Sequence, residues 1–189
     1  MIKIPSGMRD LMSAFPHEGN VVWIGVRPAP RVPMRVVTSV EAIAGRGLAG
    51  DRTAQKSRPG NKRQVTLIQA EHLLAVGALM RRDAINPALT RRNIVVAGIN
   101  LVSLKGHTFR IGGAVLELTD ECHPCSLMEA QLGRGGYNAM RGHGGMNAIV
   151  LESGLIEVGA KVEPLIATPN ALVDETSATL PLFAAEQDA

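Results

Sequence analysis

The chain has 189 residues, of which 46% are hydrophobic and 20% are charged, and its formal net charge is +3. A chain of this length and composition is expected to form one globular domain with its own hydrophobic core. Only 3% of the residues are aromatic and the basic residues form no dense stripe, so neither a base-stacking surface nor a nucleic-acid partner is expected.

Arginine accounts for fifteen of the 20 basic residues. Its planar side chain binds phosphate or carboxylate at two points, which favours a small anionic ligand. The codon use of a GC-rich genome explains the same bias equally well. Two cysteines are too few for a secreted disulfide framework, and the sequence has neither a signal peptide nor an apolar stretch long enough to span a membrane. We therefore expect a cytoplasmic protein with no membrane partner.

The first third of the chain predicts two strands and a polar loop. Residues 1–19 are expected to form a loosely attached leader. A strand follows at 20–30, where prolines end it, and a second strand with alternating polarity follows at 31–43. Residues 44–63 are rich in glycine and basic residues and have no periodicity. Long polar loops inside compact domains are more often functional than not.

The middle of the chain predicts one clear helix among strands. A strand at 64–69 precedes a helix at 70–83, with Arg81 and Arg82 in its last turn. The apolar residues at helical spacing are Leu73, Leu74, Ala78 and Leu79. Further strands are predicted at 94–96, 107–112 and 114–120, with a turn at Gly112–Gly113.

The last part of the chain predicts a short helix at 126–133, a second Gly-rich loop at 133–148, and a hairpin at 148–166 that turns at Ser153–Gly154. Residues 167–189 are expected to be a partly flexible C-terminal tail. Many short strands with glycine turns and few helices favour a mainly β, α+β fold: a single β-barrel domain at 20–166 with helical inserts.

The stretch "ELTDECHPCSLMEAQLG" contains both cysteines, Cys122 and Cys125, where a predicted strand gives way to a predicted helix. A zinc site is disfavoured because the chain has no second pair of ligands at matching spacing. A thioredoxin-type dithiol is a minority interpretation, since its βαβ setting is missing. The third interpretation is one working thiol, Cys125, which could be a nucleophile, a persulfide carrier or a soft-metal ligand. Cys125 could also be an ordinary buried hydrophobic residue.

Three other stretches offer groups that could bind an anion. "GLAGDRTAQ" contains Asp51 and Arg52, "TRRNIVVAGINL" contains Arg91, Arg92 and Asn93, and "YNAMRGHGGMNA" contains Arg141, Gly142 and His143. Glycine lets a backbone approach a phosphate closely, and arginine adds a forked contact. Each stretch alone is weak, since arginine in a loop is usually solvated, and neither Gly-rich loop has the spacing of a nucleotide-binding motif.

Taken in order, these stretches resemble the MOSC domain, the C-terminal domain family of molybdenum cofactor sulfurases. The pieces that carry the resemblance are "GLAGDRTAQ", "RQVTLIQAEHL", "RRNIVVAGINLVSLKGHTFRIGGAVLELTDECHPCSLME" and "GHGGMNAIVLESGLIEVGAKV". The pattern is similar to that of stand-alone bacterial members of the hydroxylaminopurine-reductase type. Two features depart from the family pattern: "CSLME" keeps only part of the residues that usually follow the Pro-Cys pair, and Thr53 replaces a common histidine.

The resemblance implies a β-barrel-based fold that binds the molybdenum cofactor (molybdopterin) through its phosphate. It implies that Cys125, in the pair Pro124–Cys125, ligates molybdenum or carries sulfur. The matching basic positions are Arg52, Arg92 and Arg141, beside Asn93. The implied reaction is reduction of an N-hydroxylated small molecule, with molybdenum accepting the oxygen atom.

Two different functions remain open at this point. As an oxidoreductase, the protein needs an external electron-donor reductase, since the chain has neither a four-cysteine iron–sulfur set nor a dinucleotide fingerprint. As a non-catalytic sulfur or cofactor carrier, it needs a pyridoxal-phosphate-dependent cysteine desulfurase as partner.

Overall fold

The computed structural model describes residues 7–165, which include most of the predicted leader and all but the last residue of the predicted domain. The predicted tail at 167–189 lies outside the described residues. Between residues 7 and 165, no helix is long and apolar enough to cross a membrane.

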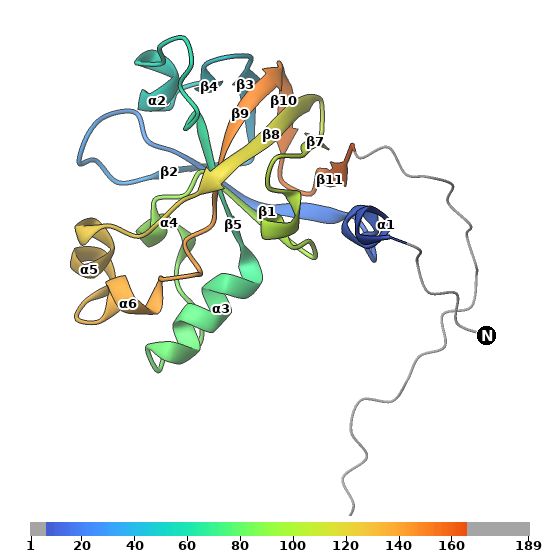
Figure 1. Ribbon diagram of the computed structural model, residues 1–189. Coiled ribbons are helices and arrows are strands. Elements are labelled where there is room, and N and C mark those ends of the chain that lie inside the picture. The colour runs from blue at the N-terminus through green and yellow to red at the C-terminus, as the bar shows by residue number, and fades with distance from the viewer. Residues whose placement is uncertain (1–6, 166–189) are drawn as a thin grey trace, which may run out of the picture.

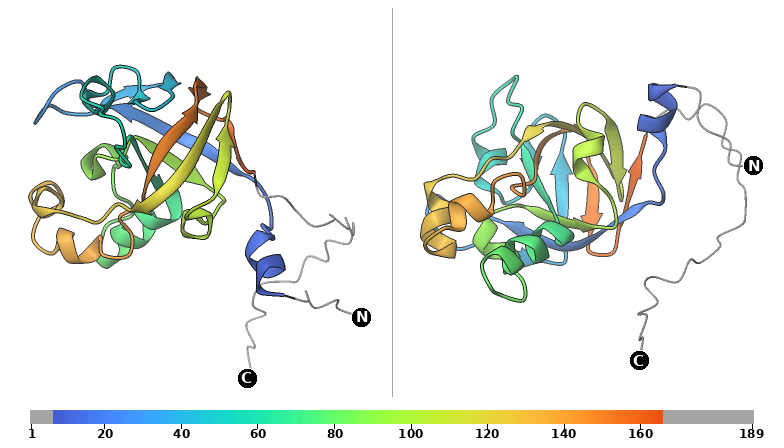
Figure 2. Two further views of the ribbon diagram at one scale, coloured as in Figure 1. Left: turned by 45° about the horizontal axis from the view of Figure 1, so that its top comes forward. Right: turned by 60° about the horizontal axis from the view of Figure 1, so that its bottom comes forward.

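Seven strands form a closed barrel (Figures 1 and 2), as the sequence predicted. They pair in the order β11-β7-β8-β9-β5-β6-β1, and the pairing of β1 with β11 closes the barrel. Six of these contacts are antiparallel, and only β5 and β6 run parallel. The strands are β1 (Gly19–Val26), β5 (Val65–Gln69), β6 (Ile94–Ala97), β7 (Thr108–Ile111), β8 (Ala114–Glu121), β9 (Met146–Glu152) and β11 (Lys161–Pro164).

Four further strands lie outside this ring. β2 (Arg35–Val37) extends the sheet beside β1, and a separate sheet has the order β10-β3-β4. Its strands are β3 (Ser39–Ile43), β4 (Gly47–Leu48) and β10 (Gly154–Glu157).

The helices are short, and most of them lie in the connections between barrel strands. They are α1 (Met8–Ser13), α2 (Arg52–Gln55), α3 (Ala70–Leu79), α4 (Pro87–Thr90), α5 (Ser126–Leu132) and α6 (Gly136–Ala139), with a 3-10 turn η1 (Leu101–Leu104). In Figure 1, α3, α4, α5 and α6 gather on one side of the barrel and α1 lies on another.

Alternation along β5 and β6 divides the hydrophobic residues between two cores. Leu67 and Ile94 point into the barrel core, whereas Ile68 and Val95 point outward into a second core. The second core is completed by residues of α3, α5 and the end of α6, namely Leu73, Val76, Met128, Leu132 and Met140, together with Ile85. Because successive strand residues face opposite sides, one pair of strands serves both cores and fixes these helices against the barrel wall.

The predicted hairpin at 148–166 is wrong in its pairing. β9 pairs with β8 and β5, whereas β10 leaves the barrel and pairs with β3. At the changeover, the Ser153 hydroxyl accepts a hydrogen bond from the backbone N–H of Ala44 at 2.9 Å. Gly154 packs directly on the backbone of Gly113, where a Cβ has no room. A sequence of alternating polarity interrupted by Ser-Gly is compatible with a hairpin and also with a strand that leaves one sheet and joins another.

Three other predictions change in detail. The strand at 31–43 is two strands, interrupted at Thr38, because its halves pair with different sheets. The loop at 44–63 contains β4 and α2. The helix at 70–83 ends at Leu79, so Arg81 lies beyond it with a positive φ of 56°. Of its four predicted apolar positions only Leu73 is buried, and Val76 and Gly77 form the rest of the packed face.

Part of the predicted leader is in contact with the barrel. Within the leader, Phe15 packs against the barrel core, and β1 already begins at Gly19.

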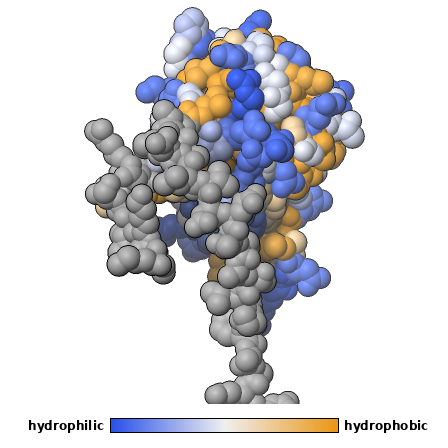
Figure 3. All heavy atoms as spheres, turned by 90° about the vertical axis from the view of Figure 1, so that its right-hand side faces the viewer, coloured by the Kyte–Doolittle hydropathy of each residue, from blue (hydrophilic) through white to orange (hydrophobic). Residues whose placement is uncertain are grey.

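On the visible part of the face in Figure 3, hydrophobic residues form patches between hydrophilic ones. Such a mixed surface is ordinary for a globular protein and marks no docking site by itself.

Candidate functional site

Asp51 and Asn93, both predicted site residues, meet at one end of the barrel and are bonded to each other. The Asn93 Nδ2 donates to the Asp51 carboxylate at 3.1 Å, and the same carboxylate accepts from the backbone N–H groups of Arg27 and Thr53, both at 2.8 Å. Asp51 is 1% exposed and Asn93 is 7% exposed. Their polar atoms are therefore used inside the protein, where they join β1, α2 and the start of β6.

Three other arginines, Arg52, Arg91 and Arg92, act electrostatically on Arg27, whose backbone N–H is bonded to this carboxylate; the four arginines are here called the arginine cluster. Burial and then Arg91 lower the pKa of Arg27, and Arg52 and Arg92 lower it further, while Asp51 acts in the opposite direction. The buried Nε of Arg27 has no hydrogen-bond partner among residues 7–165. Four neighbouring arginines, with Asp51 as the one carboxylate that acts on Arg27, leave a surplus of positive charge that suits an anion.

Sequence reasoning found Arg52 and Arg92 but not the whole cluster. Arg27 was missed because it follows directly after β1 and stands in no glycine-rich loop. Arg91 was noticed beside Arg92 but not given a role. Its left-handed backbone, with φ 61° at the end of α4, is uncommon for a non-glycine residue and occurs more often at functional sites.

Arg92 is the connection between the arginine cluster and the cysteines. It is 6% exposed, and its guanidinium donates to three backbone carbonyls: Gly144 at 2.6 Å, Cys122 at 2.7 Å and Thr90 at 2.9 Å. Burial lowers its pKa, and the nearby thiols of Cys122 and Cys125 oppose that change. Arg92 thus ties two loops together, and at most two of its five N–H donors are left for a ligand.

The two loops are the cysteine segment, 122–125, and the glycine segment, 142–145. They lie against each other, since the backbone N–H of Cys122 donates to the carbonyl of Gly145 at 2.8 Å. A Cβ at Gly144 would collide with the carbonyl of Cys122, and one at Gly145 would collide with the carbonyl of Leu67. Gly144 and Gly145 therefore serve this close backbone approach, whereas a Cβ at Gly142, the glycine that the sequence suggested for a ligand, would meet nothing within 4 Å.

The structure separates the two cysteines by exposure. Cys125 is exposed and immediately precedes α5, with an extended backbone and no hydrogen bond from its side chain to the helix. Cys122 is only partly exposed, and burial raises the pKa of its thiol against the effect of Arg92 and Arg63. Both are free thiols. Among the described residues, no group of three or more His, Cys, Asp or Glu side chains is arranged to hold a metal ion.

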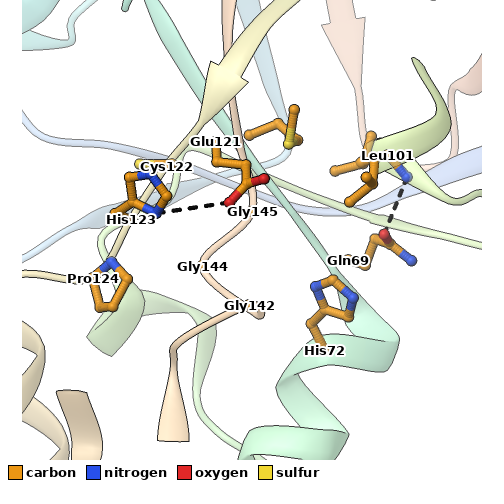
Figure 4. A pocket seen from close by; sticks show the side chains of 12 residues that line it. Gln69, His72, Leu101, Glu121, Cys122, His123, Pro124, Gly142, Gly144 and Gly145 are labelled. Atoms are coloured by element: carbon orange, nitrogen blue, oxygen red, sulfur yellow. Dashed lines mark hydrogen bonds and ion pairs between the residues drawn. The ribbon is translucent and has the colours of Figure 1, made fainter. Parts of the chain in front are cut away.

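A cavity of about 230 Å³ lies beside Cys122 (Figure 4). Its wall includes Gln69 and His72 at the start of α3, Pro124, and both Gly142 and Gly144. Gln69 is fixed by accepting a hydrogen bond from the backbone N–H of Leu101 at 3.1 Å. Sequence reasoning placed no role on the N-terminal turn of α3, because nothing in "AEHLL" departs from an ordinary helix.

The remaining predicted residues do not form one group. His143 is half-buried against His72, next to the cavity. Arg141 is exposed, and its backbone N–H donates to the carbonyl of Asn138 at 3.2 Å, but its side chain makes no hydrogen bond or ion pair within the part of the chain that the structure describes. The structure thus brings Asp51, Arg52, Arg92 and Asn93 together and places Gly142 and His143 on the other side of Arg92.

Comparisons with known proteins agree with this fold. The protein-family profile described as MOSC domain matches residues 54–163, more than half of the chain. The chain belongs to the MOSC domain family. This family is associated with binding of the molybdenum cofactor.

Solved structures of similar fold cover most of the chain. The YUAD protein from Bacillus subtilis is 19% identical with a TM-score of 0.66, covering 78% of this chain and 96% of that one. YiiM from Geobacillus stearothermophilus is 17% identical with a TM-score of 0.62, covering 78% and 75%. YiiM from Escherichia coli is 19% identical with a TM-score of 0.59, covering 80% and 71%. At these identities the likeness establishes the fold. A search of curated proteins finds no match to the chain.

Proposed function

We propose that this MOSC protein binds the molybdenum cofactor, with the arginine cluster holding its phosphate and the Cys125 thiolate ligating molybdenum. The observation that supports this best is the arginine cluster, in which three further arginines and a single buried carboxylate act on the charge of Arg27. Arg92, a member of this cluster, also bonds the carbonyl of Cys122, three residues from the exposed Cys125. Arg92 thus connects the arginine cluster, which could bind the phosphate, to the cysteine segment, which carries the exposed Cys125 thiol.

The donor set fits the cofactor chemically. A thiolate is a soft ligand and suits a thiophilic metal, while guanidinium groups suit a phosphate. The unpartnered Nε of Arg27 supplies a donor that an anion would satisfy. Within this proposal Arg27, Arg52 and Arg91 bind the phosphate, and Arg92 mainly holds the cysteine segment in place.

The reaction we propose is reduction of an N-hydroxylated small molecule, as in the hydroxylaminopurine-reductase type that the sequence resembles. When bound, the cofactor supplies two-electron oxygen-atom chemistry. The chain has two cysteines, fewer than the four that ordinarily ligate an iron–sulfur cluster. We therefore propose a separate reductase as electron donor.

Metal and pterin analysis tests the binding proposal. Protein is purified from a host that makes the cofactor, and the molybdenum and pterin content of wild type, Cys125→Ser and Cys122→Ser is measured. We expect Cys125→Ser to lose molybdenum and Cys122→Ser to keep most of it. Equal molybdenum in wild type and Cys125→Ser would overturn Cys125 as the ligand.

The phosphate role has its own matched pair of variants. Arg27→Gln and Arg91→Gln should lower pterin content without unfolding the protein, because each removes one donor of the arginine cluster. Arg110→Gln, on β7 outside the cluster, should leave pterin content unchanged. If either cluster variant kept the same pterin content as the Arg110→Gln control, that arginine would not bind the phosphate.

A turnover assay separates an enzyme from a carrier. Molybdenum-loaded protein is mixed with an artificial electron donor and an N-hydroxylated purine, and the amine product is quantified. We expect stoichiometric excess of amine over protein. A loaded sample that makes none would instead favour a carrier that works with a cysteine desulfurase.

A further inference from the structure

A surface depression of about 580 Å³ has no role in the function proposed above. It lies between the end of α3 and the loop that joins α5 to α6, and Figure 1 shows these helices on the same side of the barrel. Three arginines line it: Arg81 and Arg82 just beyond α3, and Arg134 in the loop. All three are exposed, and none of the other lining residues is charged.

The guanidinium groups of these arginines have free hydrogen-bond donors. Arg81 and Arg134 make no side-chain hydrogen bond or ion pair within residues 7–165. Arg82 donates only to the backbone carbonyl of Leu132, at 2.8 Å, which holds it across the gap between the end of α3 and the end of α5. Since each guanidinium has five N–H donors, most donors of the depression are available to a ligand.

Two acidic residues near these arginines in the sequence, Glu129 and Asp83, do not pair with them. The carboxylate of Glu129 interacts with Arg134, but its oxygens accept hydrogen bonds from backbone N–H groups, those of Gly135 at 2.8 Å and Tyr137 at 2.9 Å. Asp83 is exposed and lies outside the lining of the depression. Two carboxylates against three arginines leave the depression positively charged.

The backbone of Arg81 is a separate sign that this side chain has a role. Its φ of 56° lies in the left-handed region, directly after the last residue of the α3 cap, Met80. The N–H of Arg82 donates to the carbonyl of Gly77 at 2.8 Å, which closes the end of the helix. Glycine or asparagine is the usual residue at such a position, and arginine there costs stability. Strained residues of this kind cluster at binding sites.

The lining of the depression favours a protein ligand over free phosphate. Sites for free phosphate use unbonded backbone N–H groups, but the N–H of Gly133 donates to the carbonyl of Glu129 at 2.9 Å, and that of Gly136 donates to the carbonyl of Gly133 at 2.9 Å. The lining also contains Met80 and Leu79, which is 64% exposed. Arginine and methionine are enriched in interfaces between proteins.

We propose that the depression is a docking site for an acidic segment of a partner protein. Its carboxylates pair with Arg81, Arg82 and Arg134, because guanidinium groups bind carboxylates at two points, and an apolar side chain of the segment packs on Leu79. The inference goes beyond the proposed function and does not depend on the molybdenum cofactor. The seven residues of α5 span about 10 Å from Cys125 to the edge of the depression, so a docked partner lies near the exposed thiol.

Peptide binding tests the proposal on the full chain. The probe is a short fluorescent peptide with two glutamates on each side of a leucine, and fluorescence anisotropy measures its affinity at low and at physiological ionic strength. We expect the wild type to bind, more weakly as ionic strength rises, and to reject the same peptide with lysines in place of glutamates. A peptide with serine in place of leucine should bind more weakly. No binding of the acidic peptide at low ionic strength would overturn the inference, and equal binding of the leucine and serine peptides would overturn the apolar contact.

Charge reversals locate the site. Arg81→Glu and Arg134→Glu should each weaken peptide binding at least about fivefold. Arg46→Glu changes the net charge by the same amount at an exposed position outside the depression, and it should stay within about twofold of wild type. In amide NMR spectra, the shifts caused by the peptide should be confined to residues 79–82 and 132–139. An equal loss in all three variants, or shifts elsewhere, would place the binding outside the depression.

Arg81→Gly separates docking from folding. Glycine relieves the left-handed backbone, so the melting temperature of this variant should rise, while the missing cation should weaken peptide binding at least about threefold. A variant that gains stability cannot lose binding through unfolding, and one that binds like wild type would overturn the role of Arg81. Inorganic phosphate should displace the peptide no better than chloride of equal ionic strength. Displacement at much lower phosphate concentrations would make this a small-anion site and overturn the docking proposal.

Discussion

At the residue scale, Asp51 is the group on which the arginine cluster depends. Its two carboxylate oxygens accept three hydrogen bonds from three separate parts of the chain, and its charge acts to raise the pKa of Arg27, against burial and the other arginines. A buried carboxylate of this kind fixes the backbone at Arg27 and Thr53 and the side chain of Asn93 rather than contacting a ligand. The sequence suggested Asp51 as a binding residue because spacing cannot show which way a side chain faces.

Replacing Asp51 tests this role. In Asp51→Ala, three donors lose their acceptor and Arg27 loses a counter-charge, so the free energy of unfolding should fall by about 3 kcal/mol or more. Asp83→Ala, at an exposed position, should change it by less than about 0.5 kcal/mol. Urea unfolding of both variants and wild type measures the difference, and equal stabilities would show that Asp51 is not structural.

The cysteines make a second prediction at this scale. Burial raises the pKa of Cys122, so at a given pH less of it is thiolate, and its side chain is also less accessible than that of Cys125. Iodoacetamide at pH 8 should therefore modify Cys125 first, and modification of Cys122 should speed up as pH rises toward its raised pKa. Peptide mass spectrometry over time measures both rates, with Cys125→Ser and Cys122→Ser as controls. Faster labelling of Cys122 would contradict the exposures described above.

At the element scale, the site depends on two loops between helices and strands: the cysteine segment and the glycine segment. The glycine segment passes between β5 and the cysteine segment, and Arg92 joins both loops at the point where β6 begins. β5 and β6 are parallel, so the chain must cross over between them, and α3 lies in that crossover. The crossover places His72, in the first turn of α3, in the wall of the cavity that the two loops also line.

Two glycines of one loop form a matched pair for testing this packing. Gly142 and Gly145 have similar positive φ values, 78° and 85°, but a Cβ at Gly142 meets nothing within 4 Å, whereas one at Gly145 meets the backbone of β5. Both alanine variants should lower the free energy of unfolding because alanine is strained at a positive φ. Gly145→Ala should lower it by about 1–3 kcal/mol more because of overpacking. Thermal or urea unfolding of the two variants gives the difference. Equal losses would show that the loop yields easily.

At the scale of the whole molecule, closure of the barrel holds the two ends of the described chain together. β1 at its start pairs with β11 at its end, and β11 pairs in turn with β7. The core inside this ring contains Phe109, which is fully buried and is the largest of the fully buried side chains. A closed ring with one core should unfold as one unit.

A core substitution tests this cooperativity. Phe109→Ala should lower the free energy of unfolding by about 3–5 kcal/mol, since it removes buried surface and leaves a cavity. Val36→Ala, on β2 outside the ring with its side chain 58% exposed, should change it by less than about 0.5 kcal/mol. Circular dichroism and fluorescence of Trp23 should report the same transition midpoint. Separate midpoints would contradict a single cooperative unit.

The sequence alone determined the mainly β class, nearly all barrel strands and the short helix after the cysteines, and it suggested candidate residues for the site. These are local properties: apolar alternation, glycine turns and the composition of loops are written in consecutive residues. It also determined the resemblance to the MOSC domain, which the family comparison confirms.

Only the tertiary structure decided which strands pair and which side chains meet. Alternation does not name a partner strand, so β10 was placed in a hairpin with β9 instead of beside β3. Arg27, His72 and His143 acquire significance only through neighbours that are distant in the sequence. Closing the barrel brings those neighbours together, because contacts between remote segments depend on pairing and packing, which no local pattern contains.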